Sequence, residues 1–171
     1  DEKRISGYCD SYERAARKID LMIIGLGEDG QIGFNEPGSY EKSRTRLVQL
    51  SHHSRKVQSK FFANISETPK MAITMGIGTI MRAEKVVLMA WGEGKAPVVR
   101  SIVEGEITDQ VPASFLQRHN NLEVVVDEKG KRVWLFFGSI GKMHRVELAR
   151  DGLGVKSGAK YQHIAGLTDK E

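Results

Sequence analysis

The chain has 171 residues, of which 40% are hydrophobic and 28% charged, so it can form one globular domain with an apolar core and is not a disordered polymer. Its apolar runs are too short to cross a bilayer, and no apolar segment typical of a signal peptide follows the charged N-terminus. The single cysteine, Cys9, excludes an internal disulfide and a cysteine-rich metal site. We therefore expect a cytoplasmic protein that has no membrane partner.

The net charge of +4 raises the question of nucleic-acid binding. The 26 basic residues are spread along the chain and interrupted by acidic residues, and 129–160 is the segment that is consistently basic. A nucleic-acid binder usually concentrates its positive charge and interleaves it with aromatic residues. We expect no nucleic-acid partner, whereas a mild positive charge suits a small anionic substrate such as a sugar phosphate.

The first part of the chain predicts a helix, a strand and a long loop. Apolar residues recur at helical spacing over 1–18, and 19–25 is a continuous apolar run typical of a strand covered on both faces. Residues 28–43 are rich in Gly, Asn, Pro and Ser and predict a loop. A short strand is expected over 46–50 and a helix over 51–63.

The next part alternates predicted strands with predicted helices. Strands are expected over 71–75, 85–91 and 122–127, and helices over 78–83 and 95–103. This alternation predicts an α/β fold with an open, mostly parallel, Rossmann-like sheet that has helices on both faces. A sheet of four or five strands that begins with a helix also resembles the C-terminal part of a larger domain.

The pattern weakens toward the C-terminus. One more strand is expected over 132–137, while 138–171 holds many Gly and Lys residues and little apolar periodicity, and predicts mostly loop. We therefore divide the chain into an α/β domain over 1–128 and a basic, Gly- and Lys-rich segment over 129–171.

The glycine-rich turn after the first predicted strand is the most informative segment. Gly25, Gly27 and Gly30 form a G-x-G-x-x-G pattern, which occurs in dinucleotide-binding proteins. That site requires a helix to begin at the third glycine, and Gly33 and Pro37 oppose such a helix. The dinucleotide interpretation is therefore not favoured, and a turn without a ligand is the simpler alternative.

Two carboxylates near this turn argue for a site. Asp29 and Glu36 follow a buried strand, and ligands of open α/β sheets bind at the carboxyl ends of the strands. Two carboxylates in one crevice can adopt different protonation states and supply acid–base chemistry. Spacing alone leaves a functional site and ordinary acidic loop residues equally open.

The segment from Gly25 to Ser39 resembles the signature of the glucosamine-6-phosphate deaminase (isomerase) family, whose pattern is G-x-G-x-D-G-H-I-x-F-N-E-P-x-S. The resemblance covers roughly residues 5–128, with several further motifs in the family's order, and does not extend to the segment after 128. These further motifs are Ser43–Arg46, Ser59–Phe62, Ala72–Thr79, Gly92–Ala96 and Pro112–His119.

The resemblance implies an activity and its catalytic residues. Family members convert glucosamine 6-phosphate and water into fructose 6-phosphate and ammonia without a metal or an organic cofactor, so we expect neither here. Their motif uses an Asp, a His and a Glu in opening the sugar ring. Asp29 and Glu36 match the two acids, whereas Gln31 stands at the position of the His.

Gln31 is a chemical departure from the family pattern. A histidine can transfer a proton near neutral pH, whereas a glutamine amide donates a hydrogen bond but does not titrate. Loss of a general acid typically lowers the rate by about a hundredfold to ten-thousandfold. Impaired or altered chemistry is therefore one expectation, with Gln31 still able to orient the sugar.

The resemblance also implies residues that bind the substrate. Lys95 matches the family's phosphate-contacting Lys and stands at a predicted helix start, where free N–H groups favour an anion. Lys60 stands where the family usually has Arg, and it lacks the bidentate geometry of a guanidinium. Gly25 is expected to line the substrate. An allosteric Arg–Lys pair of some members is matched at Arg46 but not at Val48, so that site is not expected.

Parts of the family pattern have no counterpart in this chain. The family's general base and its G-G-S/T-P phosphate loop lie in an N-terminal half, and residues 1–18 resemble the middle of a family member. The chain is therefore expected to be inactive unless that half is supplied. We expect an amino-sugar-phosphate deaminase that forms a homo-oligomer. The alternatives are a non-catalytic sugar-phosphate-binding or regulatory homologue and a hydrolase resembling the 6-phosphogluconolactonases.

Overall fold

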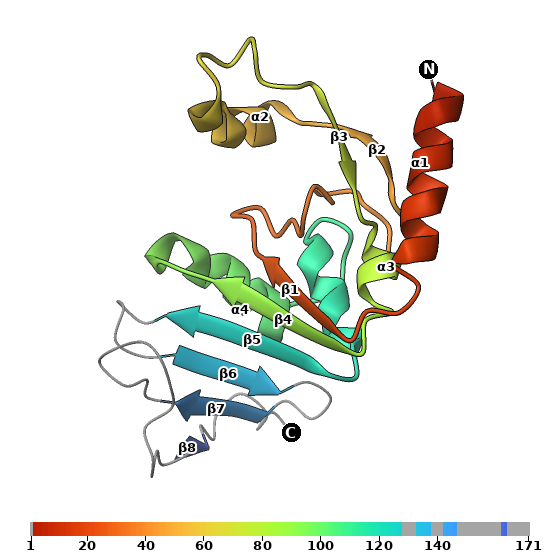
Figure 1. Cartoon of the computed structure of the whole chain (residues 1–171). Helices are drawn as coiled ribbons and strands as arrows, with labels where there is room; N and C mark the ends of the chain where they lie inside the picture. Colours follow the sequence, from red (N-terminus) through yellow and green to blue (C-terminus); the bar gives the residue numbers. More distant parts are fainter. Residues whose placement is uncertain (1, 128–132, 138–141, 147–161, 164–171) are drawn as a thin grey trace.

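The fold consists of one main sheet and a small second sheet (Figure 1). The computed structural model describes residues 2–127, 133–137, 142–146 and 162–163. The main sheet has the strand order β1-β4-β5-β6-β7-β8, and the second pairs β2 with β3. The strands are β1 Leu21–Gly25, β2 Arg46–Gln49, β3 Met71–Thr74, β4 Lys85–Ala90, β5 Leu122–Asp127, β6 Val133–Phe137, β7 Lys142–Val146 and β8 Gln162–His163.

The helices are short apart from the first. Most of them begin and end within a few residues of the sequence prediction. The helix expected over 51–63 ends earlier, because the chain passes through a 3-10 turn to Phe61 and is extended at Phe62. The α-helices are α1 Glu2–Ala15, α2 His52–Gln58, α3 Ile77–Ile80 and α4 Ala96–Glu104, and the 3-10 helices are η1 Ser59–Phe61, η2 Glu93–Lys95 and η3 Pro112–Arg118.

The central strands form the parallel sheet that the sequence predicts. β4 pairs in parallel with β1 on one side and with β5 on the other, which confirms the α/β, Rossmann-like class. From β5 onward the pairs are antiparallel. β2 and β3, predicted as further strands of the same sheet, instead form an antiparallel pair that stands above the β1 edge together with α2 (Figure 1). The C-terminal segment expected over 129–171 lies largely outside the described residues.

The hydrophobic core lies on one face of the main sheet. Alternate residues of β4 and β5 point into it and are almost wholly buried, as a strand with one covered face requires. α3, α4 and η3 supply the apolar side chains that meet them. α1 lies beside β2 (Figure 1). The core includes Ile77, Ile80, Val86, Leu88, Ile102, Leu116, Leu122 and Val124.

The opposite face of β1 is open in the described part of the chain. Leu21 and Ile23 point away from the core and are 52% and 61% exposed. The continuous apolar run predicted a strand covered on both faces, and for β1 this expectation is not met by the described residues. The strand itself is where the sequence places it.

Glu13 fastens α1 to the rest of the fold. Its side chain is 1% exposed, and its carboxylate accepts hydrogen bonds from the backbone N of Thr45 at 2.8 Å and from Nη2 of Arg82 at 2.8 Å. The hydroxyls of Thr45 and Thr79 donate to the same carboxylate. Burial alone would raise the pKa of Glu13, but the hydrogen bonds from Thr45, Thr79 and Arg82 outweigh it and hold the pKa well below its ordinary value.

Glu13→Gln is expected to lower the free energy of unfolding by about 2 kcal/mol at pH 7, because hydrogen bonds to a charged group contribute about 1.5–3 kcal/mol. The depressed pKa means that this stabilisation is complete above the unfolded pKa of about 4.3 and is lost as the pH falls below it. Urea unfolding should therefore show a smaller difference between the two proteins at pH 3 than at pH 7.

The matched control is Glu84→Gln. Glu84 is exposed and pairs with Lys18 at 3.8 Å, so its replacement should change the unfolding free energy by less than about 1 kcal/mol. Equal effects of the two substitutions would contradict the anchoring role of Glu13.

Candidate functional site

The candidate site begins where β1 ends. Leu26 N donates to Met89 O at 3.2 Å and so extends the parallel ladder by one residue, and a loop without helix or strand then runs to the start of β2. Gly30, with φ 82°, and Gly33, with φ 59°, adopt the left-handed backbone that this loop requires. A Cβ at Gly27 would collide with the side chains of Asp29 and Gln31. The glycines therefore let the two polar side chains fold back over the turn.

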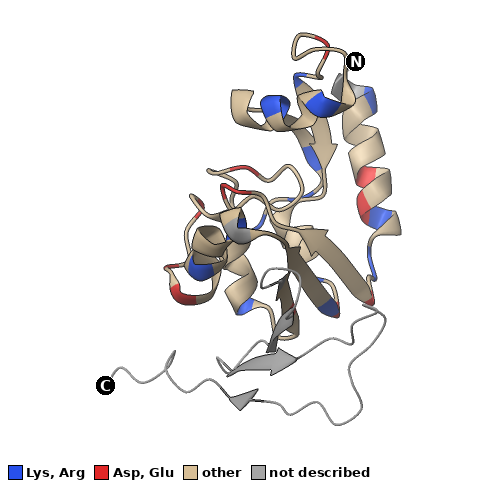
Figure 2. Cartoon of the chain, turned by 90° about the vertical axis from the view of Figure 1, so that its left-hand side faces the viewer, with Lys and Arg blue, Asp and Glu red and all other residues tan. Residues whose placement is uncertain are grey.

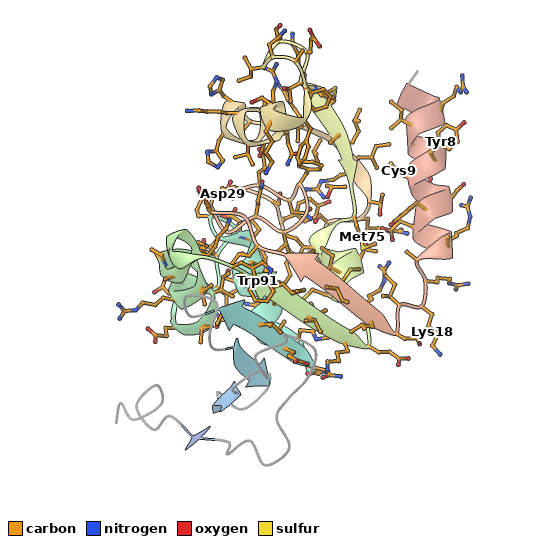
Figure 3. All side chains as sticks on the ribbon, turned by 60° about the vertical axis from the view of Figure 1, so that its left-hand side comes forward. Tyr8, Cys9, Lys18, Asp29, Met75 and Trp91 are labelled. Carbon is orange, nitrogen blue, oxygen red and sulfur yellow. The ribbon has the colours of Figure 1, made fainter. Side chains whose placement is uncertain are left out.

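Asp29 and Gln31 are held together within this turn. Gln31 N donates to Oδ1 of Asp29 at 3.1 Å, and Gly27 N donates to Gln31 O at 2.8 Å. Both side chains are half-buried. Figure 3 shows Asp29 below α2 at one end of the sheet, with Lys18 at the opposite end. The turn thus presents an acid and an amide at the carboxyl end of a parallel strand, where ligands bind in open α/β sheets.

Glu36 is bound to the start of α2. Ser51 is the N-cap residue of this helix, and its backbone N and its hydroxyl both donate to the Glu36 carboxylate at 3.1 Å. Ser54 N donates to Ser51 Oγ at 3.1 Å, as an N-cap requires. A carboxylate at this position is also favoured by the partial positive charge of the helix N-terminus.

Ser54 connects Gln31 to the start of α2 through hydrogen bonds. Its side chain is buried, and its hydroxyl donates to Oε1 of Gln31 at 3.2 Å. Glu36, Ser51, Ser54 and Gln31 are therefore linked in sequence, and Gln31 is linked in turn to Asp29. The structure thus brings the three predicted catalytic positions together in one hydrogen-bonded cluster.

Asn35 fixes the loop between these residues. Its side chain is wholly buried, and Nδ2 donates to Ile32 O and to Met75 O, each at 2.8 Å. Its Oδ1 accepts from Nη1 of Arg46 at 2.9 Å, and Nη2 of Arg46 donates to Ser39 Oγ at 3.3 Å. Burial lowers the pKa of the Arg46 guanidinium from its ordinary value.

In the described part of the chain, the predicted substrate-binding residues lie outside this hydrogen-bonded cluster. Lys95 is the N-cap residue of α4 and is half-buried, while Lys60 is exposed in η1 with its Nζ 5.0 Å from the ring centre of Phe61. At Gly25 the space that a Cβ would occupy is open. Figure 2 shows acidic positions on the loop after β1, between α2 with its basic positions and the start of α4.

Sequence reasoning missed Ser51 and Ser54 as members of the site. The available signal was a serine at a predicted helix start with a second serine three residues later, which indicates a cap rather than a ligand. Among the described residues, no group of three or more His, Cys, Asp and Glu side chains could hold a metal ion. No helix in the same part of the chain is long and apolar enough to cross a membrane.

Known proteins resemble this chain over the part that contains the cluster. The family model described as "Glucosamine-6-phosphate isomerases/6-phosphogluconolactonase" matches residues 2–126. A glucosamine-6-phosphate deaminase of Bacillus cytotoxicus is 45% identical over 123 residues, which are 71% of this chain and 47% of that protein. A putative glucosamine-6-phosphate deaminase-like protein of Bacteroides thetaiotaomicron is 49% identical over 123 residues, which are 70% of this chain and 19% of that protein.

Solved structures of similar fold include members of the same family. A monomeric glucosamine-6-phosphate deaminase superposes with a TM-score of 0.70 at 38% identity, over 73% of this chain and 53% of that chain. The 6-phosphogluconolactonase of Trypanosoma brucei, at a TM-score of 0.56 and 20% identity over 74% of this chain and 52% of that chain, shares the fold. The chain spans about half the length of most curated relatives that it matches. It belongs to the glucosamine-6-phosphate isomerase/6-phosphogluconolactonase family.

Proposed function

We propose that the chain carries the ring-opening part of an amino-sugar-phosphate deaminase, which converts glucosamine 6-phosphate and water into fructose 6-phosphate and ammonia in cytoplasmic amino-sugar catabolism. The observation that supports this most is the hydrogen-bonded cluster that joins Asp29, Gln31 and Glu36 at the carboxyl end of β1. The named relatives at 45% identity support the same reaction. The proposal requires neither a metal nor an organic cofactor.

In this proposal the two carboxylates handle the protons of ring opening. The ring oxygen must gain a proton and the hydroxyl at C1 must lose one, so a proton donor and a proton acceptor are needed on the same sugar face. Glu36 accepts hydrogen bonds from Ser51 at the start of α2, and its carboxylate is the candidate proton acceptor. Asp29 is held within the turn by the hydrogen bond that it accepts from Gln31 N.

In this proposal, Gln31 donates a hydrogen bond to the sugar. Because its Oε1 accepts from Ser54, the amide NH₂ group is the end left for a ligand. Such a group can hold the ring oxygen but cannot deliver a proton to it, so the proton has to come from a carboxyl group or from water. The expected consequence is slow ring opening.

Lys95 and Lys60 supply positive charge for the phosphate. Lys95 places an ammonium group at the N-terminus of α4, where the helix dipole also favours a bound anion. Lys60 lies beyond α2 and provides a single, less directional contact.

A second candidate function is sugar-phosphate binding without catalysis, and the non-titrating Gln31 favours it. The phosphogluconolactonase alternative receives less support, because the lactonase from Trypanosoma brucei shares 20% identity and therefore the fold alone. Ammonia release distinguishes these functions. We expect it from glucosamine 6-phosphate and not from glucose 6-phosphate, when the chain is mixed with the N-terminal half of the Bacillus cytotoxicus deaminase. Binding without ammonia release would favour the non-catalytic function, and absence of binding would exclude both.

Lys95→Ala is expected to weaken the affinity for glucosamine 6-phosphate by about 1.5–3 kcal/mol, the range for a hydrogen bond to a charged group. Calorimetric titration of the purified chain measures this loss. Lys18→Ala is the matched control, since Lys18 lies at the opposite end of the sheet and should leave the affinity unchanged (Figure 3). An unaltered affinity of the Lys95 variant, with the fold intact by circular dichroism, would remove Lys95 from the site.

Gln31→His is expected to raise the rate of ammonia release at least about tenfold, because it restores a titratable group beside the ring oxygen. The pH–rate profile should gain an ionisation within a unit or two of the free imidazole pKa of about 6.5. Gln49→His, on the exposed end of β2, adds a histidine outside the cluster and should change neither quantity. A slower but folded Gln31 variant would mean that the glutamine serves another substrate or another proton route.

A further inference from the structure

The start of η3 contacts the glycine-rich loop at Gly30. Ala113 N donates a hydrogen bond to Gly30 O at 2.9 Å, and a Cβ at Gly30 would lie 2.6 Å from Cγ1 of Val111. Gly30 is buried and has φ 82°, so both its space and its backbone conformation require glycine. It stands between Asp29 and Gln31. The backbone that joins two of the predicted site residues is therefore held by Ala113 and Val111.

A second contact to the same loop lies beside Glu36. Glu36 O accepts a hydrogen bond from Ser39 N at 3.0 Å, which closes a turn around Pro37 and Gly38. Proline and a glycine with positive φ, here 90°, suit the two central positions of a type II turn. Gly38 N donates to Asp109 O at 2.8 Å. The turn that begins at Glu36 is therefore bound to the segment that precedes η3.

Ser114 fixes the shape of the segment that makes both contacts, residues 108–114, which we call the supporting segment. Ser114 is 0% exposed, and its hydroxyl accepts a hydrogen bond from Thr108 N at 2.9 Å and donates one to Thr108 O at 3.0 Å. Its backbone N donates to Val111 O at 2.7 Å. One buried side chain therefore holds both backbone polar groups of Thr108 and closes the segment into a loop.

The supporting segment is anchored in the hydrophobic core. Ala113, Phe115 and Leu116 of η3 belong to the core and are buried. The side chains of the cluster are linked separately, through Ser51 and Ser54 at the start of α2. The backbone of the glycine-rich loop is thus supported from the core, independently of those side-chain links.

We propose that Ser114 is a positioning residue of the candidate site. Its hydroxyl holds the supporting segment against Gly30 and Gly38. These two contacts set the separation between the carboxylates of Asp29 and Glu36. Because Ser114 is wholly buried, it acts through the loop backbone and not on the sugar. The inference rests on the proposed function, in which both carboxylates act on one sugar ring.

The separation of two catalytic groups has a large effect on their chemistry. A side chain that transfers a proton must come within about 2.6–3.2 Å of the atom that gains or loses it. A displacement of about 1 Å can lower a rate about a hundredfold. The chain between β1 and β2 has no helix or strand of its own, so contacts to neighbouring segments decide the path of its backbone. Ser114 controls two of these contacts.

Three variants of the full chain test the proposal. Ser114→Ala removes the hydroxyl, and Ser114→Thr replaces it with another hydroxyl. Thr79→Val is the matched control, because Thr79 is also 0% exposed and its hydroxyl donates to Glu13 in the anchor of α1. Both losses of a buried hydroxyl should lower the free energy of unfolding. Ser114→Ala should also disturb the glycine-rich loop, and Thr79→Val should not.

NMR of the isotope-labelled chain reports on the loop without a ligand. In Ser114→Ala, hydrogen exchange of the Gly38 amide should become at least about tenfold faster, because its hydrogen bond to the supporting segment is loosened. The side-chain carboxyl ¹³C signals of Asp29 and Glu36 should also shift. Thr79→Val should leave both readouts unchanged, and Ser114→Thr should restore them.

Calorimetric titration with glucosamine 6-phosphate adds a functional readout. The affinity should fall at least about tenfold in Ser114→Ala, stay unchanged in Thr79→Val and recover in Ser114→Thr. Val111→Ala keeps Ser114 and shortens the side chain that contacts Gly30, so it should weaken the affinity in the same direction. If Ser114→Ala fails to fold, this variant decides, and an unchanged affinity of the folded Val111→Ala protein would contradict the proposal.

Two further results would overturn the proposal. One is a folded Ser114→Ala variant in which Gly38 exchange and the carboxyl signals are unchanged. The other is an equal loss of affinity in Thr79→Val, which would show a general effect of lower stability. Absence of binding by the unaltered chain would contradict the proposed function instead, and the exchange and carboxyl signals would still decide the role of Ser114.

Discussion

The buried side-chain amide of Asn35 ties the glycine-rich loop to the pair of strands β2 and β3. It binds Ile32 within the loop, Met75 directly after β3 and Arg46 at the start of β2. A buried amide that lost these partners would leave unsatisfied polar groups, each costing about 1–3 kcal/mol. The loop therefore has one stable path, and that path sets where Glu36 meets the N-terminus of α2. The geometry of the candidate site follows from this constraint.

At Gln31 the candidate site has a non-titrating amide where the family motif has a histidine. Its backbone N still binds Asp29, and its side chain is still held by Ser54, so the amide occupies a defined position. An amide in that position can orient a sugar oxygen but cannot exchange a proton with it. Sugar-phosphate recognition and slow catalysis are thus compatible with the same arrangement. In our proposal, an enzyme and a binding protein differ in whether another group supplies the proton that Gln31 cannot.

Local features of the fold were predictable from sequence, and long-range ones were not. The apolar runs of β1 and β4 and the glycine turn between Gly25 and Gly33 were recognised, because strand and turn signals are local. The pairing of β2 with β3 was missed, since alternation predicts a strand but not its partner. The partners of Glu13 lie 31 to 69 residues away, so an acidic residue on a helix face gave no sign of its burial.

The residues of the candidate site were predictable from the sequence, but the hydrogen bonds that link them were not. Asp29, Gln31 and Glu36 were found through the family motif, and the structure links them through Ser51 and Ser54. Those serines carry a signal that any helix start gives, so only the folded chain reveals that they link two of the predicted site residues. The exposure of Ile23 likewise differs from the expectation for its strand.

A titration of the ¹⁵N-labelled chain with glucosamine 6-phosphate, followed by NMR, tests the central claim most directly. The account predicts that the largest chemical-shift changes fall on the backbone amides of 25–31, on Ser51 and Ser54, and on Lys95, with the Gln31 side-chain NH₂ signals among them. Saturable changes confined to other parts of the chain, or no changes at millimolar ligand, would contradict it.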